Sequence, residues 1–193
     1  MLEPIVNALV FLINIIADLY VFILIARIIL VWVHADDYNP MTKFIAKLTD
    51  FSVLRLKRLI PNIKDLETAS LLLIFLIEIV KFFLIGVLAY SMPNVFGLLL
   101  LAFAETLKLT INVFFYAILL QVILSWFPHT RSDIYNLLSI ITAPIMRPIR
   151  RYLHPVHGFD LSPIPALIGL QLIVILFVDP LYSAGMHLAF GSF

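Results

Sequence analysis

Four long apolar stretches dominate this sequence, and they constrain its fold more than any other feature. A helix needs about 20 predominantly apolar residues to cross the hydrocarbon core of a bilayer. The stretches that meet this requirement are 5–33, 69–90, 107–127 and 165–184. Hydrophobic residues make up 63% of the chain and charged residues 13%, and a soluble domain of this size could not bury that much apolar surface. The sequence therefore predicts an all-α membrane protein with four transmembrane helices.

The third apolar stretch is longer than a single bilayer crossing requires. Residues 95–127 are apolar with few interruptions, and Glu105 and Lys108 divide them. Because charged side chains are expensive inside a bilayer, we expect the span to occupy 107–127. Residues 95–104 are then expected to form an interfacial or extended helical turn.

Lysine and arginine residues concentrate in the two long connections between spans. Residues 34–68 carry six of the 13 basic residues, and residues 128–164 carry four. Loops that are rich in Lys and Arg stay on the cytoplasmic side of the membrane. We therefore expect both long loops to be cytoplasmic and both termini to lie outside.

The chain repeats itself after about 94 residues. The segment Arg27–Trp32 aligns with Gln121–Trp126, and similar matches follow in the loops. Each unit contains a span, a basic loop and a second span, so the two units, 1–93 and 94–193, share one orientation and form tandem two-span repeats. The repeat either records the duplication of a stable hairpin or forms a symmetric transport path.

Each basic loop is predicted to contain an amphipathic interfacial helix. In the second unit, Ser132 is a suitable N-cap for a helix that ends at Pro144, and Pro148 can begin a second short turn. In the first unit, Pro40 can open a helix. Apolar residues recur at helical spacing in both helices. They are Ile134, Leu137, Leu138 and Ile141 in the second unit, and Met41, Phe44, Ile45 and Leu48 in the first.

Basic and aromatic side chains accompany these helices. Lys43 and Lys47 lie beside the apolar side of the first helix. Such a helix is expected to lie in the headgroup region, with its apolar side toward the bilayer and its cations toward anionic lipid headgroups. Trp32 and Trp126 fall where the first and third spans reach this interface, as the residues of an aromatic belt do.

Three segments of the second unit resemble the signature of the YggT family. They are Leu124-Ser125-Trp126-Phe127-Pro128, Thr142 to Arg151, and Gly158-Phe159-Asp160-Leu161-Ser162-Pro163. The resemblance extends to the first unit, which lacks the prolines of the second segment and the sequence of the third. It implies a small integral protein of the bacterial cytoplasmic membrane without established enzymatic activity. It also implies several settings: osmotic tolerance and potassium balance, cell division, or, in plastid relatives, nucleoid distribution or b-type cytochrome assembly.

The loop of the second unit carries one candidate site, an interfacial surface that would bind lipid or a protein partner. Its residues are Trp126, Arg147, Arg150, Arg151, Asp160 and Ser162. The alternative is that the cations only set the orientation of the chain and hold the loop at the membrane surface.

Polar and ionisable side chains within the spans form a second candidate site. An ionisable residue in a span costs about 2.5–3.5 kcal/mol to insert and is by default a functional candidate. The residues that would line an ion path are Asp18, Arg27, Glu78, Lys81, Asn112, Gln121 and Asp179. The alternative is that they are satisfied pairs that fix the register of the bundle.

Positions along the spans predict which of these side chains meet in the first unit. At about 1.5 Å per residue, Asp18 and Lys81 lie at one level, and Arg27 can reach Glu78 at a lower level. Glu78 and Lys81 are three residues apart and can pair with each other instead.

In the second unit, Asn112 is predicted to meet Asp179. Pro180 follows Asp179 within the span and is expected to kink it. Glu105 and Lys108 are expected near the outer interface.

Several classes of function are excluded or disfavoured. The chain has no Cys, which excludes disulfides, thiol catalysis and cysteine-bound metals. None of the five His is expected in the middle of a span, and the sequence has no phosphate-binding glycine loop. We therefore expect no cofactor, no metal site and no enzymatic activity. With a net charge of +1, no bulk field draws the chain to nucleic acid.

Two functions remain. The first is a membrane scaffold, assembly or osmotic-homeostasis factor that acts through the basic interfacial loops. The second is a component of a potassium or proton channel or transporter that uses the charged residues within the spans. The expected partners are the lipid bilayer, its anionic headgroups, and either another membrane protein or a second copy of this chain.

Overall fold

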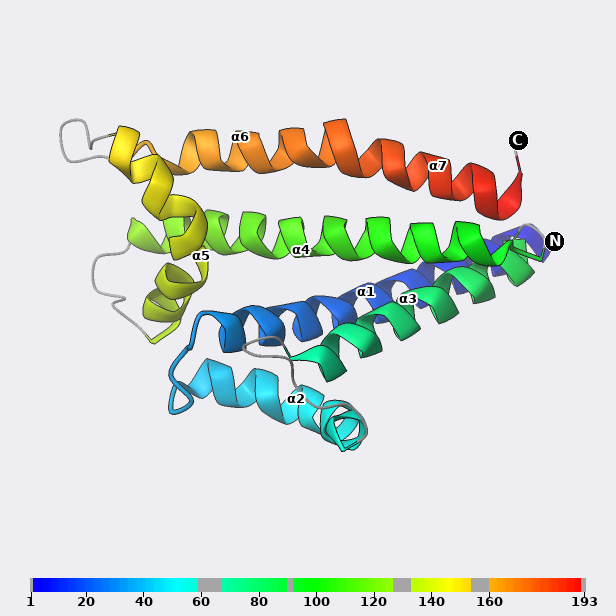
Figure 1. Cartoon of the computed structure of the whole chain (residues 1–193), viewed down its shortest axis with the longest axis horizontal. Coiled ribbons are helices and arrows are strands. Elements are labelled where there is room, and N and C mark those ends of the chain that lie inside the picture. Colours follow the sequence, from blue (N-terminus) through cyan, green and yellow to red (C-terminus); the bar gives the residue numbers. More distant parts are fainter. Residues whose placement is uncertain (1, 59–66, 90–91, 127–132, 154–159, 192–193) are drawn as a thin grey trace.

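The computed structural model describes residues 2–58, 67–89, 92–126, 133–153 and 160–191, and all regular structure in these ranges is helical. The elements in chain order are α1 (Leu2–Trp32), α2 (Pro40–Lys57), α3 (Thr68–Ala89), α4 (Val95–Ser125), α5 (Asp133–Tyr152), α6 (Pro163–Ile173), the π-helical segment η1 (Val174–Val178) and α7 (Asp179–Phe190). Figure 1 shows α1, α3, α4 and the continuous rod α6–η1–α7 running along the length of the molecule.

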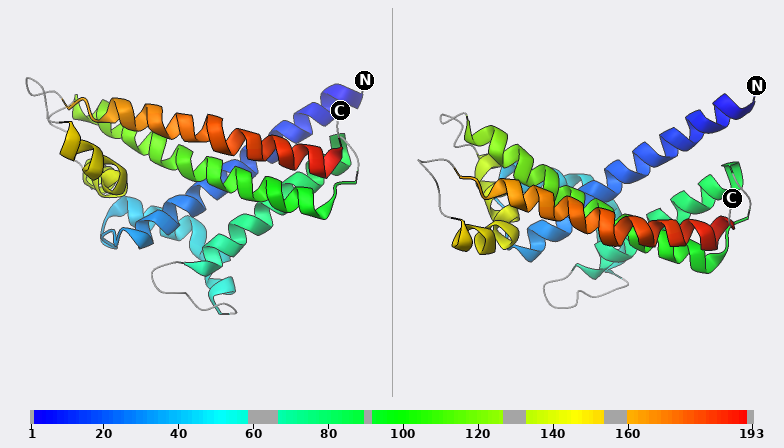
Figure 2. Two further views of the ribbon diagram at one scale, coloured as in Figure 1. Left: turned by 45° about the horizontal axis from the view of Figure 1, so that its top comes forward. Right: turned by 90° about the horizontal axis from the view of Figure 1, so that it is seen from above.

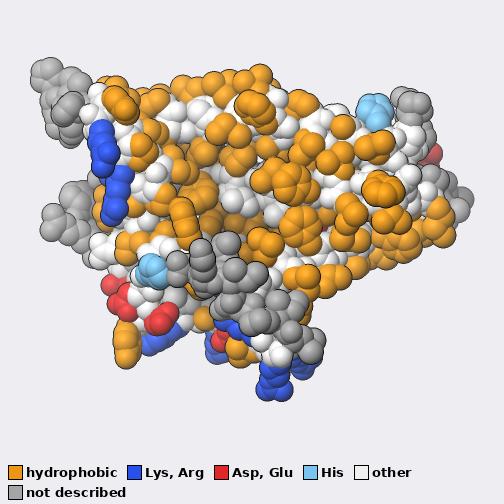
Figure 3. All heavy atoms as spheres, in the orientation of Figure 1, with side chains coloured by type: hydrophobic (Ala, Val, Ile, Leu, Met, Phe, Trp, Pro, Cys, Tyr) orange, Lys and Arg blue, Asp and Glu red, His pale blue; other side chains and the backbone are white. Residues whose placement is uncertain are grey.

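Four helices are long and apolar enough to cross a membrane, which confirms the predicted number of spans. They are Glu3–Trp32, Thr68–Ala89, Val95–Ser125 and Pro163–Phe190. Figure 3 shows apolar side chains covering the long sides of this bundle, whereas Lys and Arg side chains gather at one end. The chain is therefore a multi-pass membrane protein.

The predicted start of the third span at 107 is wrong, because α4 is a single helix of 31 residues that begins at Val95. Residues 95–104 extend this helix rather than forming a separate interfacial turn. The helix begins where Asn94 Oδ1 accepts a hydrogen bond from the Phe96 N–H group at 2.9 Å. Lys108 does not end the span, because its ammonium group pairs with Asp179 on a neighbouring helix. The charge of Lys108 therefore does not mark the boundary of the span, because Asp179 on another helix pairs with it.

The fourth span is also longer than the predicted range 165–184. The disturbance predicted at Asp179 and Pro180 takes the form of the π-helical segment η1, directly before them. A π-helical turn bonds each residue to the fifth one along rather than the fourth. This wider pattern lets the helix continue past a proline, which has no N–H group to donate. Figure 1 shows α6 and α7 as one gently bent rod.

Both loop helices lie at one end of the bundle, and both termini lie at the other (Figures 1 and 2). We call these the loop end and the terminal end. α2 packs against α1 and α3, while α5 packs against α4 and α6. The two basic loops therefore share one side, as predicted, and their assignment to the cytoplasm stays a prediction.

The loop of the second unit holds one helix rather than a helix and a separate turn. Pro144 and Pro148 both lie inside α5, which bends along its length in Figure 1. Prolines in a helix interior bend it because each removes a hydrogen bond and crowds the preceding turn. Buried side chains on both sides of Pro144, Ile141 and Met146 among them, hold the bent helix on the bundle. The predicted cap, Ser132, lies outside the described residues.

The loop helix of the first unit begins at Pro40 as predicted, with Asn39 as its N-cap. Its apolar side chains do not share one side. Met41 and Ile45 pack against the core, together with the buried Val53, whereas Phe44 and Leu48 are exposed. α2 therefore has an apolar contact face toward the bundle and additional apolar side chains on its outer surface.

The core between the spans falls into separate clusters. Between the loop end and the middle of the bundle, Val21, Leu24 and Ile74 pack together with residues from α4 and α5. At the terminal end, α3, α4 and α7 meet in a second cluster that includes Phe82 and Phe190. The first of these clusters separates the polar groups of the loop end from those in the middle of the spans.

We predict that Gly97→Ala destabilises the contact between α4 and α7. A Cβ atom at Gly97 would lie 2.2 Å from the backbone nitrogen of Ala189, so the two helices must separate. We expect a loss of about 1–3 kcal/mol, the usual cost of overpacking, measured by thermal unfolding in detergent micelles. Gly169→Ala is the matched control, because its Cβ would meet nothing within 4 Å. Equal unfolding temperatures for the two variants would contradict the close contact.

Candidate functional site

The Arg27 side chain joins three elements at the loop end. Its guanidinium group is buried, and it donates from Nε to Glu67 Oε2 at 2.7 Å and from Nη2 to Glu67 Oε1 at 3.2 Å. Nη1 donates to Thr49 Oγ1 and to Asp50 Oδ1, each at 2.6 Å. α1 is thereby fixed to the middle of α2 and to the residue that precedes α3.

Glu67 completes a balanced group of charges. Its side chain is 1% exposed and forms ion pairs with both Arg27 and Lys57, and it accepts a hydrogen bond from Ser70. Burial by itself raises the pKa of the Glu67 carboxyl. The hydrogen bonds from Arg27, Lys57 and Ser70 and the Arg27 charge outweigh this effect, so the pKa lies below its usual value. Two cations, Arg27 and Lys57, thus face two carboxylates, Asp50 and Glu67.

The predicted pairing of Arg27 with Glu78 is wrong. Arg27 extends toward the loop end and meets Glu67, which lies 11 residues before Glu78, or roughly 16 Å at the rise of a helix. Long basic side chains near the end of a span extend toward the interface in this way. Sequence reasoning did not identify Glu67 as the partner of Arg27, because Glu67 precedes the apolar stretch. Its position directly before a span nevertheless places a carboxylate at the level of Arg27.

In the second unit, a neutral contact occupies the corresponding place. Gln121 aligns with Arg27, and its Oε1 accepts a hydrogen bond from Thr142 Oγ1 at 2.7 Å. Thr142 lies 93 residues after Thr49, the partner of Arg27. Both side chains of the Gln121–Thr142 pair are buried. α5 is therefore fixed to α4 by an amide and a hydroxyl, where the first unit uses an arginine and carboxylates.

Three of the predicted interfacial residues meet where α5 ends and α6 begins. Arg150 Nε and Nη2 both lie 2.9 Å from Asp160 Oδ2. Asp160 Oδ1 accepts from the backbone N–H group of the buried Ser162 at 3.0 Å. Burial raises the pKa of Asp160, but the hydrogen bonds from Ser162 and the Arg150 charge outweigh it, so the pKa lies below its usual value.

The other predicted interfacial residues lie at the surface. Arg147 lines a groove of about 560 Å³ between the end of α1 and α5, together with Trp32, Pro144 and Arg150. Trp126, 71% exposed, lines a smaller cavity of about 320 Å³ that also contains Gln121, Arg150 and Asp160. Arg151 is exposed near the end of α5. The residues thus surround two hollows that meet at Arg150.

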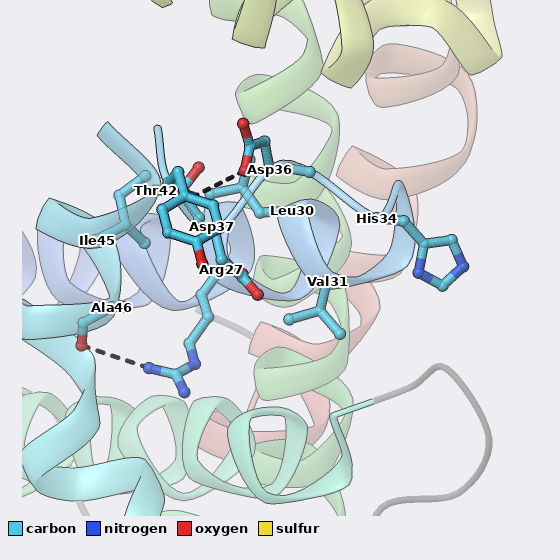
Figure 4. A pocket seen from close by; sticks show the side chains of 11 residues that line it. Arg27, Leu30, Val31, His34, Asp36, Asp37, Thr42, Ile45 and Ala46 are labelled. Carbon is cyan, nitrogen blue, oxygen red and sulfur yellow. Dashed lines mark hydrogen bonds between the residues drawn. The ribbon is translucent and has the colours of Figure 1, made fainter. Parts of the chain in front are cut away.

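A third hollow of about 600 Å³ lies between α1 and α2. Figure 4 shows Arg27 at its base, reaching toward the Ala46 carbonyl oxygen, with His34 at the far side. Asp36 and Asp37 also line this hollow. Within the described parts of the chain, no three His, Asp or Glu side chains are grouped so as to hold a metal ion.

In the middle of the spans, the predicted pair of Asp18 and Lys81 is confirmed. Lys81 Nζ donates to Asp18 Oδ1 at 2.7 Å. The same ammonium nitrogen lies 2.5 Å from Glu78 Oε2, so the alternative pairing of Glu78 with Lys81 also forms. One cation on α3 therefore serves two carboxylates, one on its own helix and one on α1.

Asp179 has a different partner from the one predicted. Lys108 Nζ lies 3.5 Å from Asp179 Oδ1, whereas Asn112 was expected in that place. Lys108 is 13 residues from the start of α4, about 20 Å along the helix, so the expected place of Glu105 and Lys108 near the outer interface is wrong as well. Both corrections follow from the start of α4 at Val95.

Comparison with known proteins gives one consistent family. A family model described as CCB3/YggT matches residues 6–88 and 100–181, which fall within the two predicted units. The uncharacterized protein YggT of Escherichia coli strain K12 is 32% identical over 185 residues, covering 96% of this chain and 97% of that protein. An uncharacterized Vibrio alginolyticus protein is 34% identical over 167 residues, 86% and 90% of the two chains. An uncharacterized Pseudomonas aeruginosa protein is 35% identical over 178 residues, 91% and 90%. No solved structure matches.

We predict that Arg27→Gln destabilises the chain strongly, because Glu67 and Asp50 lose the cation that neutralises them. Removing one partner from a buried ion pair costs about 3–5 kcal/mol, which denaturant unfolding in mixed micelles would measure. Arg55→Gln on the exposed side of α2 is the control, with an expected change within about 0.5 kcal/mol. The double variant Arg27→Gln with Glu67→Gln should recover part of the loss. If the Arg27 and Arg55 variants are equally stable, the Arg27 network does not hold α2.

Proposed function

This chain belongs to the CCB3/YggT family, and we propose that it is a non-enzymatic membrane scaffold that holds another membrane protein against the surface of α2 and α5. One observation carries the proposal. Both loop helices are fastened to the bundle by buried polar contacts, Arg27 with Thr49 and Glu67 in the first unit and Gln121 with Thr142 in the second. A loop that only set the orientation of the chain would not need a fixed position.

The free-energy cost of burying these contacts supports the view that α2 and α5 need a defined position. Burying an ion pair gains little net stability, because the desolvation of both charges offsets their attraction. A buried polar contact does specify one arrangement, since alternatives leave charges unpaired. In this chain, the arrangement so specified is the position of α2 and α5 relative to the spans. We infer that this position matters for binding.

The outer surface of α2 and α5 has the chemistry of a protein interface. Arginine and aromatic side chains are enriched where proteins bind one another. The exposed cations are Lys43, Lys47, Arg55, Arg58, Arg147, Arg150 and Arg151, and the exposed aromatic side chains are Trp32, Phe44, Phe51, Trp126 and Tyr152. A partner that fits this surface presents carboxylates next to apolar side chains, at the level of the membrane interface.

We place this surface on the cytoplasmic side of a bacterial inner membrane, because the loops that carry it hold ten of the 13 basic residues. Osmotic homeostasis is the physiological setting that we propose, and the family resemblance supports it. Anionic headgroups would share the same cations, since each Lys or Arg near the surface attracts them by about 1 kcal/mol.

A photo-crosslinking residue at Tyr152, 87% exposed on α5, is predicted to give a discrete protein adduct in native membranes. The variant Arg147→Glu with Arg151→Glu should abolish the adduct, because it reverses two charges while leaving the Arg150–Asp160 pair in place. Arg147→Lys with Arg151→Lys should retain it.

The same crosslinker at Leu188, exposed at the terminal end, is the positional control and should not give this adduct. Adducts with lipid alone would contradict a scaffold and leave a lipid anchor. A protein adduct that survives the charge reversal would contradict the role of Arg147 and Arg151 in holding the partner.

A second candidate function, a component of a potassium or proton transport path, is favoured by the charges in the middle of the spans. Lys81 and Glu78 are buried there, and the half-buried Asp18 pairs with Lys81. Between this group and the loop end, Val21, Leu24 and Ile74 are between 0 and 1% exposed. A path across one copy of the chain would have to cross that apolar layer.

Proteoliposomes that contain the wild-type chain are predicted to stay tight to potassium and protons, because the layer of Val21, Leu24 and Ile74 closes the bundle. The measurement is flux of both ions, with Asp18→Asn and Lys81→Met beside the wild type. Flux that both substitutions abolish would overturn the scaffold in favour of the transport component. Equal leakage from all three preparations would indicate damaged vesicles. Vesicles of the same lipid without protein, measured without ionophore, identify such damage.

A further inference from the structure

Each of the four spans carries an ionisable residue close to its midpoint. They are Asp18 in α1 (Leu2–Trp32), Glu78 in α3 (Thr68–Ala89), Lys108 in α4 (Val95–Ser125) and Asp179 in the span Pro163–Phe190. Lys81 and Glu105 lie within one turn of two of them. We call these six residues the mid-membrane belt. The scaffold proposed above does not require it.

The belt contains two sets of contacts, one between α1 and α3 and one between α4 and α7. Lys81 bridges Asp18 and Glu78, at 2.7 Å and 2.5 Å. Lys108 lies 3.5 Å from Asp179. Glu105 interacts electrostatically with both Lys81 and Lys108.

The charges of the belt do not balance. Four carboxyl groups, those of Asp18, Glu78, Glu105 and Asp179, face two ammonium groups, those of Lys81 and Lys108. If every group were ionised, the carboxylates would outnumber the cations by two in the middle of a membrane. An uncompensated charge in an apolar medium is so unfavourable that the group neutralises instead. The Arg27 network at the loop end, by contrast, is balanced.

Glu78 is the member of the belt that is least satisfied. Its side chain is 0% exposed. Neither carboxyl oxygen accepts a hydrogen bond from any described residue, and only Oε2 has an ion contact, with Lys81. An ionised carboxylate has about four acceptor sites to fill. A protonated Glu78 would explain why a fully buried carboxyl oxygen of this residue lacks a hydrogen-bond donor.

We propose that the mid-membrane belt is a proton-binding site with Glu78 as its buried acceptor. The charge imbalance and the unpartnered Glu78 oxygen support this independently of each other. A metal cation fits less well, because the Lys81 ammonium already occupies the position between Asp18 and Glu78. The proton binds to Glu78 as H⁺ from water and leaves as H⁺, so no other reactant is needed.

The two ends of the belt reach the outer surface of the bundle. Asp18 is 35% exposed, and Lys108 and Asp179 are 37% and 48% exposed. Figure 2 shows the N-terminal part of α1 diverging from α4 and α7. The charged and titratable groups that face Glu78 or the belt are Asp18 from α1, Lys81 from α3, Glu105 and Lys108 from α4, and Asp179 and Tyr182 from α7.

The test is infrared spectroscopy of the full-length chain in nanodiscs at neutral pH. We expect the carbonyl stretching band of a protonated carboxylic acid, shifted in heavy water because the proton exchanges. Glu78→Gln should weaken this band, because it removes the buried acceptor. Glu3→Gln is the matched control, because Glu3 is exposed at the start of α1, and it should leave the band unchanged. Elution as a single species and unchanged helical circular dichroism show that each variant folds.

A second variant keeps the proposal testable if Glu78→Gln does not fold. Lys81→Met removes a cation, so the belt must bind more protons and the band should grow, whereas a purely structural Lys81 predicts no increase. Absence of the band in the wild-type chain, or an undiminished band in Glu78→Gln, overturns the proposal. Loss of the wild-type band on adding potassium or sodium chloride at constant pH also overturns it, because the site then holds a metal cation.

Discussion

The buried guanidinium group of Arg27 determines how the first half of the chain is assembled. It contacts the side chains of Thr49, Asp50 and Glu67 at once, so α1, α2 and the start of α3 cannot move independently without leaving a buried charge unpaired. Lys57 supplies the second cation that Glu67 requires. The rest of the loop end depends on this arrangement, because Asn39, the N-cap of α2, donates from Nδ2 to the Asp133 carbonyl oxygen at the start of α5 at 3.0 Å.

The second half of the chain joins its loop helix to the spans with neutral groups. The two halves therefore share a fold but differ in the chemistry of this contact. Gln121 and Thr142 join α4 to α5 at positions that align with Arg27 and Thr49. A neutral amide–hydroxyl contact avoids most of the desolvation cost of an ion pair. Asp160 and Arg150 place the charged contact of this half at the surface instead. Arg150 therefore lies at the rim of the exposed groove beside α5, whereas the Arg27 charge of the first half is buried.

The sequence was sufficient for features that depend on one segment or on depth alone. Apolar length located four spans, loop composition placed both basic loops together, and depth paired Asp18 with Lys81. It failed where a partner on another helix decides the outcome. Lys108 was predicted to mark the edge of a span because its partner Asp179 lies 71 residues away. Glu78 was predicted as the partner of Arg27 because the direction of the Arg27 side chain toward the loop end was not considered. The bent continuity of α5 depends on buried side chains on both sides of Pro144, which no local pattern specifies.

The polar groups of the chain lie in two zones that α1 connects. Arg27 belongs to the loop end and Asp18 to the middle of the membrane, nine residues apart on one helix, and Val21, Leu24 and Ile25 between them are buried in the core. Residues that are nine apart face opposite sides of a helix, so the two charges do not interact directly. A change of charge at Asp18 that moved α1 relative to α2 would be resisted by the bonds of Arg27 to Thr49, Asp50 and Glu67. The same arginine that gives the loop surface its shape thus keeps that surface insensitive to the protonation of the belt.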